Sequence, residues 1–87
     1  MTDGVPSKEA IFAELQRVFS EEFGFAESTL LPETRIVDDL DLDSIDSIDF
    51  VVTLEAEAGI RVEDEELRGL RRFQDMVELV HRKLAAA

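Results

Sequence analysis

An acidic run with two serines, residues 38–49, holds the residue types in this sequence that are best suited to chemistry. It reads Asp-Asp-Leu-Asp-Leu-Asp-Ser-Ile-Asp-Ser-Ile-Asp, so the tetrapeptide Asp-Ser-Ile-Asp occurs twice, around Ser44 and around Ser47. We expect a helix to begin at Asp43 or Ser44. The unpaired N–H groups and the positive dipole end of a helix start favour a neighbouring phosphate. Ser44 is therefore suited to a phosphodiester linkage.

The same run partly matches a calcium-binding loop. Asp39, Asp41 and Asp43 have the one-three-five spacing of an EF-hand. Position six, where a glycine makes the sharp turn, is Ser44, and position twelve, where a bidentate glutamate should stand, is Phe50. An acidic calcium-binding module is therefore the weaker alternative, and we expect no resident metal.

The composition limits the class of protein that can carry this motif. The chain has 87 residues and no cysteine, and its 21 acidic and nine basic residues give a net charge of −12. That charge repels nucleic acid and anionic membranes and favours partners with basic surfaces. A chain this short buries only a thin core. Its single histidine is His81, and no sequence motif pairs a nucleophile with a base. We therefore expect a carrier or binding module and no enzyme.

Helical periodicity accounts for most of the chain. Ser7 is a suitable N-cap and Gly24 a suitable stop for a first helix. Further helices are predicted from residue 43 or 44 to 58, over 63–67, which is short, and over 73–84. The apolar stripes of the first and last helices are predicted to face the core: Ile11, Phe12, Leu15, Val18, Phe19 and Phe23, then Phe73, Val77, Val80 and Leu84.

Residues 25–42 lose this period, and Pro32 interrupts them. We predict one long ordered loop there, anchored by four apolar side chains: Leu30, Leu31, Ile36 and Leu40. A loop of that length in a small domain is commonly functional. The expected fold is an all-α bundle of three main helices plus one short helix, with a flexible segment over 1–6, one domain over 7–84 and a tail over 85–87.

The predicted second helix carries two apolar stripes when residues advance by about 100° each. One stripe is predicted to face the core and holds Phe50, Val51, Leu54 and Ala58. The other holds Ile45, Ile48, Val52 and Ala56. Either this second stripe packs inside the small bundle, or it is an exposed anchor for partner proteins, since apolar residues at such spacing are how helices dock into grooves.

The run Asp38-Asp39-Leu40-Asp41-Leu42-Asp43-Ser44-Ile45-Asp46 closely resembles the acidic Asp-Ser-Leu signature of acyl carrier proteins, whose serine receives 4′-phosphopantetheine. The resemblance covers nearly the whole chain and includes the Gly24 turn, Glu55 and Glu57, the acidic stretch 63–66, and Phe73-Gln74-Asp75. It implies a freestanding carrier whose Ser44, beside Asp43, bears the arm, and whose arm thiol holds acyl thioesters of fatty acid, polyketide or related lipid biosynthesis.

The duplicated tetrapeptide leaves Ser47 as the alternative attachment residue. Ser44 alone places Asp39 and Leu40 at the family's distances upstream. Ser47 also projects into the core arc of the helical wheel. We therefore assign the arm to Ser44.

The resemblance also implies partners: a phosphopantetheinyl transferase, and acyl-transferring and condensing enzymes with basic docking patches. Acidic residues around the arm would steer the carrier toward those patches. The predicted partner-binding residues are Ile45, Asp46, Ile48, Asp49, Val52, Glu55 and Ala56. For each of the charged residues a merely solvated helix face is the alternative. We expect a cytoplasmic monomer.

Three positions depart from the family pattern. Asp41 stands where a glycine is common, Ala58 where a bulky aromatic is common, and Arg72 where a Ser or Thr would cap the last helix. Arg71 and Arg72 form a small basic spot, which we leave outside the predicted site. Aryl, peptidyl and D-alanyl carriers share the fold and the serine, and the acidic approach to Ser44 favours acyl cargo over theirs.

Overall fold

The computed structural model describes residues 5–40 and 44–86, with the side chains of 44–47 left out. These residues form α1 (Lys8–Phe23), a 3-10 helix η1 (Glu27–Thr29), α2 (Ser44–Ala58), α3 (Asp64–Arg68) and α4 (Phe73–Ala86), and within the described ranges there is no strand. The predicted all-α bundle of three main helices and one short helix is confirmed. Asp41 and Asp43 lie outside the described residues.

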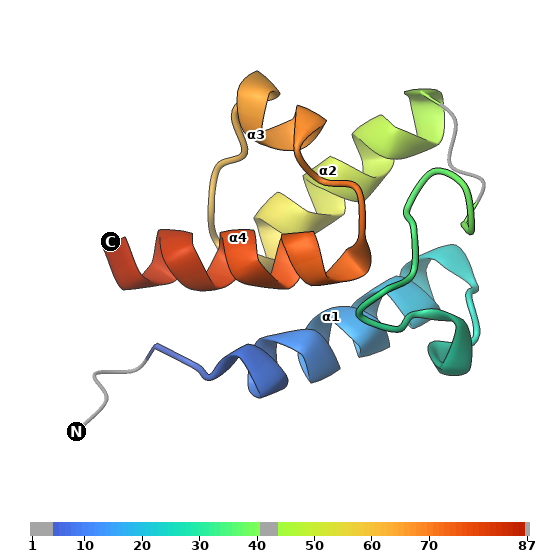
Figure 1. Ribbon diagram of the computed structural model, residues 1–87, viewed down its shortest axis with the longest axis horizontal. Coiled ribbons are helices and arrows are strands. Elements are labelled where there is room, and N and C mark those ends of the chain that lie inside the picture. The colour runs from blue at the N-terminus through green and yellow to red at the C-terminus, as the bar shows by residue number, and fades with distance from the viewer. Residues whose placement is uncertain (1–4, 41–43, 87) are drawn as a thin grey trace.

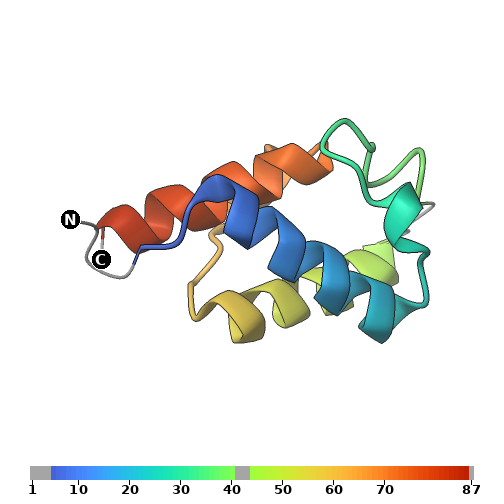
Figure 2. The same cartoon turned by 90° about the horizontal axis from the view of Figure 1, so that it is seen from below.

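The three long helices pack around one apolar core. α1 and α4 lie side by side and run in opposite directions, so that the start of α1 and the end of α4 meet at one end of the molecule (Figure 1). α2 lies against the same pair and also runs opposite to α1, as the turned view shows (Figure 2). The shared core is built from buried residues of all three helices and of the loop between α1 and α2.

The helix ends follow the predicted chemistry. The Ser7 hydroxyl accepts a hydrogen bond from the N–H of Ala10 at 3.1 Å. Gly24 ends α1 in the left-handed conformation, with φ of 77°, and Gly59 follows α2 with φ of 67°, a region that glycine enters without steric cost. α3 begins one residue later than predicted, behind a capping box of Glu63 and Glu66, and α4 extends two residues beyond the predicted end.

All six phenylalanines of the chain belong to one connected aromatic cluster. Phe50 of α2 stacks on Phe19 of α1 with ring centroids 4.1 Å apart and planes at 5°, and Phe19 meets Phe73 of α4 edge to face at 6.2 Å. Such pairs add to the hydrophobic stabilisation of the rings. The cluster therefore joins the three long helices directly, with Ala58 partly buried against the same core.

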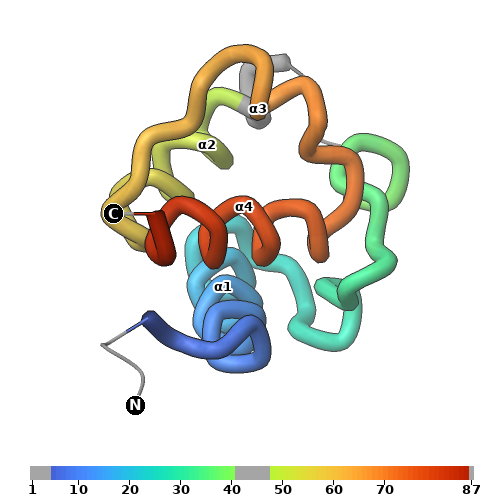
Figure 3. The backbone as a smooth tube through the Cα atoms, turned by 60° about the vertical axis from the view of Figure 1, so that its left-hand side comes forward, coloured from blue at the N-terminus to red at the C-terminus, as the bar shows by residue number. Residues whose placement is uncertain are grey.

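The loop between α1 and α2 covers the end of the bundle where α1 ends and α4 begins (Figure 3). Leu30, Ile36 and Leu40 are buried, as predicted. The prediction for Leu31 was wrong, since its side chain is 41% exposed. A turn causes this, because the N–H of Thr34 donates to the carbonyl of Leu31 at 3.0 Å. The loop prediction also missed η1.

Thr34 is the buried polar residue of this loop, and pattern reasoning did not single it out. Its hydroxyl accepts from the N–H of Leu31 at 2.9 Å and donates to the carbonyl of Thr29 at 2.6 Å. Both hydrogen-bonding functions of the hydroxyl are thus used inside the loop. Thr34 holds the loop in shape from within.

The same loop satisfies the first turn of α4, which lacks a Ser or Thr cap. The N–H of Phe73 donates to the carbonyl of Thr34 at 2.8 Å, and that of Gln74 to the carbonyl of Pro32 at 2.9 Å. Asp75 accepts from the N–H of Arg72 at 2.9 Å. The departure at Arg72 therefore leaves no orphaned amide at these positions, because carbonyls of a distant segment replace the missing side-chain cap.

Candidate functional site

The candidate site is the start of α2 together with the segment that leads into it. α2 begins at Ser44, so the residue predicted to bear a phosphodiester stands where helix N–H groups are unpaired. Leu40 is buried and fixes the chain four residues earlier. The segment that ends at Leu40 is therefore anchored to the core, and α2 begins at Ser44, one of the two predicted starting residues.

A charged turn shapes the approach to α2. The carboxylate of Asp39 accepts from the backbone N–H of Arg35 at 2.8 Å and from its guanidinium at 3.1 Å. These bonds hold the pKa of the Asp39 carboxyl below its ordinary value, the backbone bond being the larger cause. The same carboxylate raises the pKa of Arg35. The aspartate that precedes Leu40 thus stays ionised and ties the turn together.

The two faces of α2 differ in burial. On the predicted core face, Phe50 and Leu54 are buried, and Val51 and Ala58 are half-buried. On the second stripe, Ile48 is 63% exposed and Val52 is 56% exposed; Ala56, on the same stripe, is also exposed, as is Asp49. Side-chain positions for Ile45 and Asp46 lie outside what the structure describes. The described part of the second stripe therefore faces solvent instead of a neighbouring helix.

Glu55, one of the predicted partner-binding residues, has a contact inside the protein. Its half-buried carboxylate accepts from the N–H of Val62 at 2.8 Å. This bond holds the segment after Gly59 against the last turn of α2. One oxygen of Glu55 therefore serves the fold, whereas Glu57 is exposed.

A groove of about 910 Å³ lies between the first half of α2, the loop before it and the segment from α3 to α4. Its apolar lining includes Ile36, Val37, Ile48, Val51, Leu67 and Leu70. Val37 and Leu67 are 58% and 37% exposed. Exposed apolar side chains grouped in one hollow mark a binding surface more often than the same residues scattered singly. The groove and the exposed stripe of α2 meet at Ile48.

Four arginines line the same groove: Arg35, Arg68, Arg71 and Arg72. Sequence reasoning saw only Arg71 and Arg72 and left them outside the site. Arg68 lies three residues before Arg71, so it extends the same local basic stretch, whereas Arg35 lies more than 30 residues earlier in the chain. Only the tertiary structure brings Arg35 to the other three.

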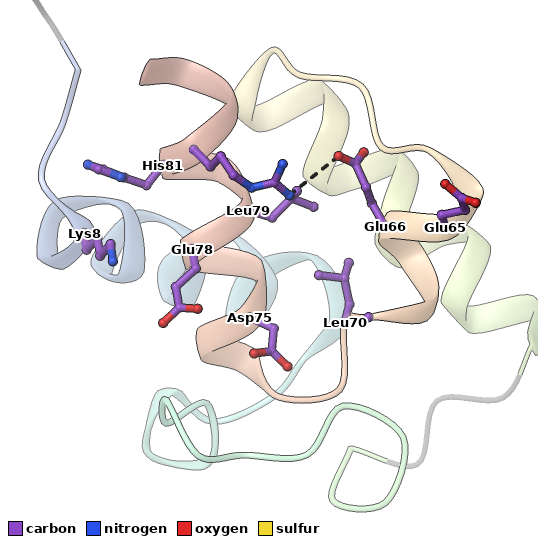
Figure 4. Close-up of a pocket in the computed structure, with 10 residues that line it drawn as sticks. Lys8, Glu65, Glu66, Leu70, Asp75, Glu78, Leu79 and His81 are labelled. Atoms are coloured by element: carbon purple, nitrogen blue, oxygen red, sulfur yellow. Dashed lines mark ion pairs between the residues drawn. The ribbon is translucent and has the colours of Figure 1, made fainter. Parts of the chain in front are cut away.

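A second hollow, of about 550 Å³, lies between α3 and α4 (Figure 4). Glu66 is paired there with Lys83 at 2.8 Å and with Arg82 at 3.6 Å. Those contacts and the N–H of Glu63 hold the pKa of Glu66 below its ordinary value, the backbone bond first. His81 also lines this hollow, away from the start of α2. These ion pairs link α3 to α4, so we interpret the charged residues here as structural.

The calcium alternative gains no support from the described residues. Two of its aspartates, Asp41 and Asp43, lie outside them, and its twelfth position, Phe50, is buried in the aromatic cluster. Among the side chains that the structure places, no group of three or more His, Asp or Glu could hold a metal ion.

The chain matches a known protein family over a region that includes α2. A family model described as "Phosphopantetheine attachment site" matches residues 13–80, which include the whole of α2. The chain belongs to this phosphopantetheine-binding family of acyl carrier proteins. Phosphopantetheine is accordingly the cofactor of the family to which this carrier belongs.

Individual acyl carrier proteins are similar over most of this carrier. That of Thermotoga maritima is 36% identical over 90% of this chain and 96% of its own length, and that of Myxococcus xanthus is 39% identical over 85% and 94%. The meromycolate extension acyl carrier protein of Mycolicibacterium smegmatis is 36% identical over 87% and 77%.

A solved structure shows the same fold. The crystal structure of an acyl carrier protein from Thermotoga maritima superposes with a TM-score of 0.76, at 33% identity, over 91% of this chain and 92% of that chain. These relatives are carriers of bound groups by name. Within the described part of this carrier, no helix is both long and apolar enough to cross a bilayer.

Proposed function

We propose that Ser44 is the residue that receives 4′-phosphopantetheine, and that the protein carries acyl thioesters between enzymes of fatty acid, polyketide or related lipid biosynthesis. The observation that supports this most is the start of α2 at Ser44 within the matched family region. A helix of 15 residues directs its unpaired N–H groups and positive dipole end toward that position. These groups suit the phosphate that links the arm to the serine.

The chain's own contribution to loading is the Ser44 hydroxyl. With a phosphopantetheinyl transferase and Mg²⁺, its oxygen attacks the pyrophosphate of coenzyme A. A new O–P bond forms, the bond to the departing adenosine bisphosphate breaks, and the hydroxyl proton passes to the transferase or to solvent. The arm, once bound, supplies a thiol that holds acyl groups as electrophilic thioesters. The protein itself presents this serine to the transferase and carries out no other step.

We further propose that the exposed stripe of α2 is the partner-docking surface. Ile48, Val52 and Ala56 provide apolar anchors, and Asp43, Asp46 and Asp49 add negative charge near the arm. Apolar anchors give contact area in a partner groove, and the acids steer the encounter with basic enzyme patches and raise the association rate. Ile45 belongs to the same stripe by helical spacing, and Glu55 contributes with the part of its carboxylate that is not bonded to Val62.

Intact mass after incubation with coenzyme A, Mg²⁺ and a broad-specificity transferase tests the attachment site. We expect the native chain and Ser47→Ala each to gain one phosphopantetheinyl group, and Ser44→Ala to gain none. Ser47→Ala is the matched control, because it removes the same hydroxyl from the second tetrapeptide. A gain that persists in Ser44→Ala and is lost in Ser47→Ala would move the arm to Ser47. No gain in any variant would leave only an acidic interaction module.

The docking surface is tested on carrier that is already loaded. Ile48→Ala and Val52→Ala should leave the free energy of unfolding within about 0.5 kcal/mol of the native value, since both side chains are mostly exposed. The rate of acyl transfer to a condensing enzyme should fall in both. Ala13→Ser, on an exposed position of α1, is the control. Equal transfer rates in all variants would contradict docking through this stripe.

A further inference from the structure

The groove beside α2 is rich in arginine. It contains four of the nine basic residues of a chain whose net charge is −12. Among the described residues that line it, Asp38 is the one acid, and Asp38 is paired with Arg35 at 3.5 Å. The groove is therefore a local positive region on a strongly acidic molecule.

The four arginines differ in whether their guanidinium groups already contact a partner in the protein. Arg35 is held by Asp38 and Asp39, and the guanidinium of Arg72 donates to the carbonyl of Glu33 at 3.1 Å. Arg68 and Arg71 are exposed, and neither forms an ion pair with a side chain that the structure places. The guanidinium groups of Arg68 and Arg71 are thus the two best placed to meet an anion.

The groove also offers apolar surface beside these charges. Val37, Ile48 and Leu67 line it while remaining exposed, so a ligand that covers them gains by removing them from water. The volume of about 910 Å³ is in the range of small-molecule sites, roughly 300–1,000 Å³. The ligand that fits both features has an apolar chain and an anionic end.

We propose that this groove holds acyl cargo that ends in a carboxylate, with the chain against Val37, Ile48 and Leu67 and the carboxylate paired with Arg68 and Arg71. Guanidinium and carboxylate groups form strong charge-assisted pairs of matching geometry. The inference rests on the proposed arm at Ser44. Ile48 lies four residues beyond Ser44, hence one turn along the same face of α2. An arm attached at Ser44 therefore starts beside the groove and keeps the cargo on its thiol near the groove at high effective concentration.

The test compares two cargoes that differ only at the far end. The protein is loaded from hexanoyl-coenzyme A and from adipoyl-coenzyme A, whose acyl chain has the same six carbons but ends in a carboxylate. Contacts of the arm itself are the same in both forms and cancel in the comparison. Intact mass and the Ser44→Ala variant first establish loading, so a failure to load refutes the proposed function, whereas loading without discrimination between cargoes refutes the present inference alone.

The first readout is the backbone amide spectrum. We expect the adipoyl form to differ from the hexanoyl form at residues 67–72, and this difference to vanish in Arg68→Gln/Arg71→Gln. Arg61→Gln, which removes one exposed arginine outside this groove, is the control for the loss of surface positive charge and should keep this difference. The charge-conserving Arg68→Lys/Arg71→Lys variant should retain most of it, and the spectrum of each unloaded variant reports whether the fold is intact.

The second readout is thioester cleavage by hydroxylamine, taken as the ratio of the adipoyl to the hexanoyl rate. This ratio should rise roughly two- to fivefold in Arg68→Gln/Arg71→Gln, the range expected for an exposed ion pair, and should not change in Arg61→Gln. Equal spectra and equal ratios in all variants would overturn the proposal. A loss of transfer to partner enzymes in the glutamine variant, with both cargoes affected alike, would also overturn it and would assign the arginines to an acidic partner segment.

Discussion

The two faces of α2 use the same kind of residue for opposite purposes. Phe50 and Leu54 are 3% and 0% exposed and join the helix to α1 and α4. Ile48 and Val52, two residues before Phe50 and two before Leu54, lie largely in water. Apolar character therefore does not decide burial here, because a helix in so small a bundle can bury only one side. The exposed side keeps apolar groups that contribute little to the fold and are available to cargo and partners.

The largest expected effect comes from removing an aromatic ring on the buried face of α2. Phe50→Ala deletes stacking against Phe19 and Phe23 and leaves a cavity, which should lower the free energy of unfolding by about 3–5 kcal/mol. That is a large part of the roughly 5–15 kcal/mol available to a domain. Urea unfolding measures it.

Val52→Ala is the matched control for Phe50→Ala, since it shortens an apolar residue of the same helix on the exposed face. Its free energy of unfolding should stay within about 0.5 kcal/mol of the native value. Similar losses in the two variants would show that the exposed stripe packs against the bundle in solution, and the contrast between the faces would disappear.

A smaller effect is expected in the loop that forms one wall of the groove. Thr34→Val keeps the shape of the buried side chain and removes the partner of the Leu31 N–H and the Thr29 carbonyl. We expect a loss of about 1–3 kcal/mol in the free energy of unfolding. Thr29→Val, at an exposed position, is the control. An unchanged free energy of unfolding in Thr34→Val would show that these two hydrogen bonds do not stabilise the loop.

The crowded acids of α2 and of the segment before it predict a response to salt. Carboxylates at residues 38–49 repel one another in a chain of net charge −12, and counter-ions screen that repulsion. Added NaCl or Mg²⁺ should therefore raise the melting temperature, and Asp49→Asn should reduce the rise. A melting temperature that changes with neither NaCl nor Mg²⁺ would show that repulsion between these carboxylates does not destabilise the folded protein.

The smallest expected effect concerns Asp39, which shapes the turn before α2. Its pKa is lowered below the ordinary 3.8 in the folded protein, so its ionised form stabilises the fold above that value, and this contribution is lost as the pH falls through the lowered folded pKa. The difference in unfolding free energy between the native chain and Asp39→Asn should be full at pH 6 and shrink below pH 4. Asp38→Asn is the control, and a difference independent of pH would contradict the assignment.

Much of this architecture follows from local signals in the sequence. Ser7, Gly24 and the period of apolar residues predicted α1 from its cap to its stop, and the acidic serine motif predicted where α2 begins. These signals act over a few residues, through caps, turn glycines and one-sided stripes. The error at Leu31 came from the same approach, because its turn depends on Thr34, whose hydroxyl bonds have no hydrophobic signature.

Local patterns were enough to predict the long helices, the acidic character, the family resemblance and the serine that we expect to bear the arm. The packed structure was needed to show that the second stripe of α2 lies in water. It was also needed to show how α4 begins, since Thr34 and Pro32 supply backbone carbonyls to its first turn. It also brought Arg35 to the groove that Arg68 and Arg71 line. The physical reason is distance along the chain: caps and periodicity are local, whereas a groove forms from segments that meet only after the core has packed.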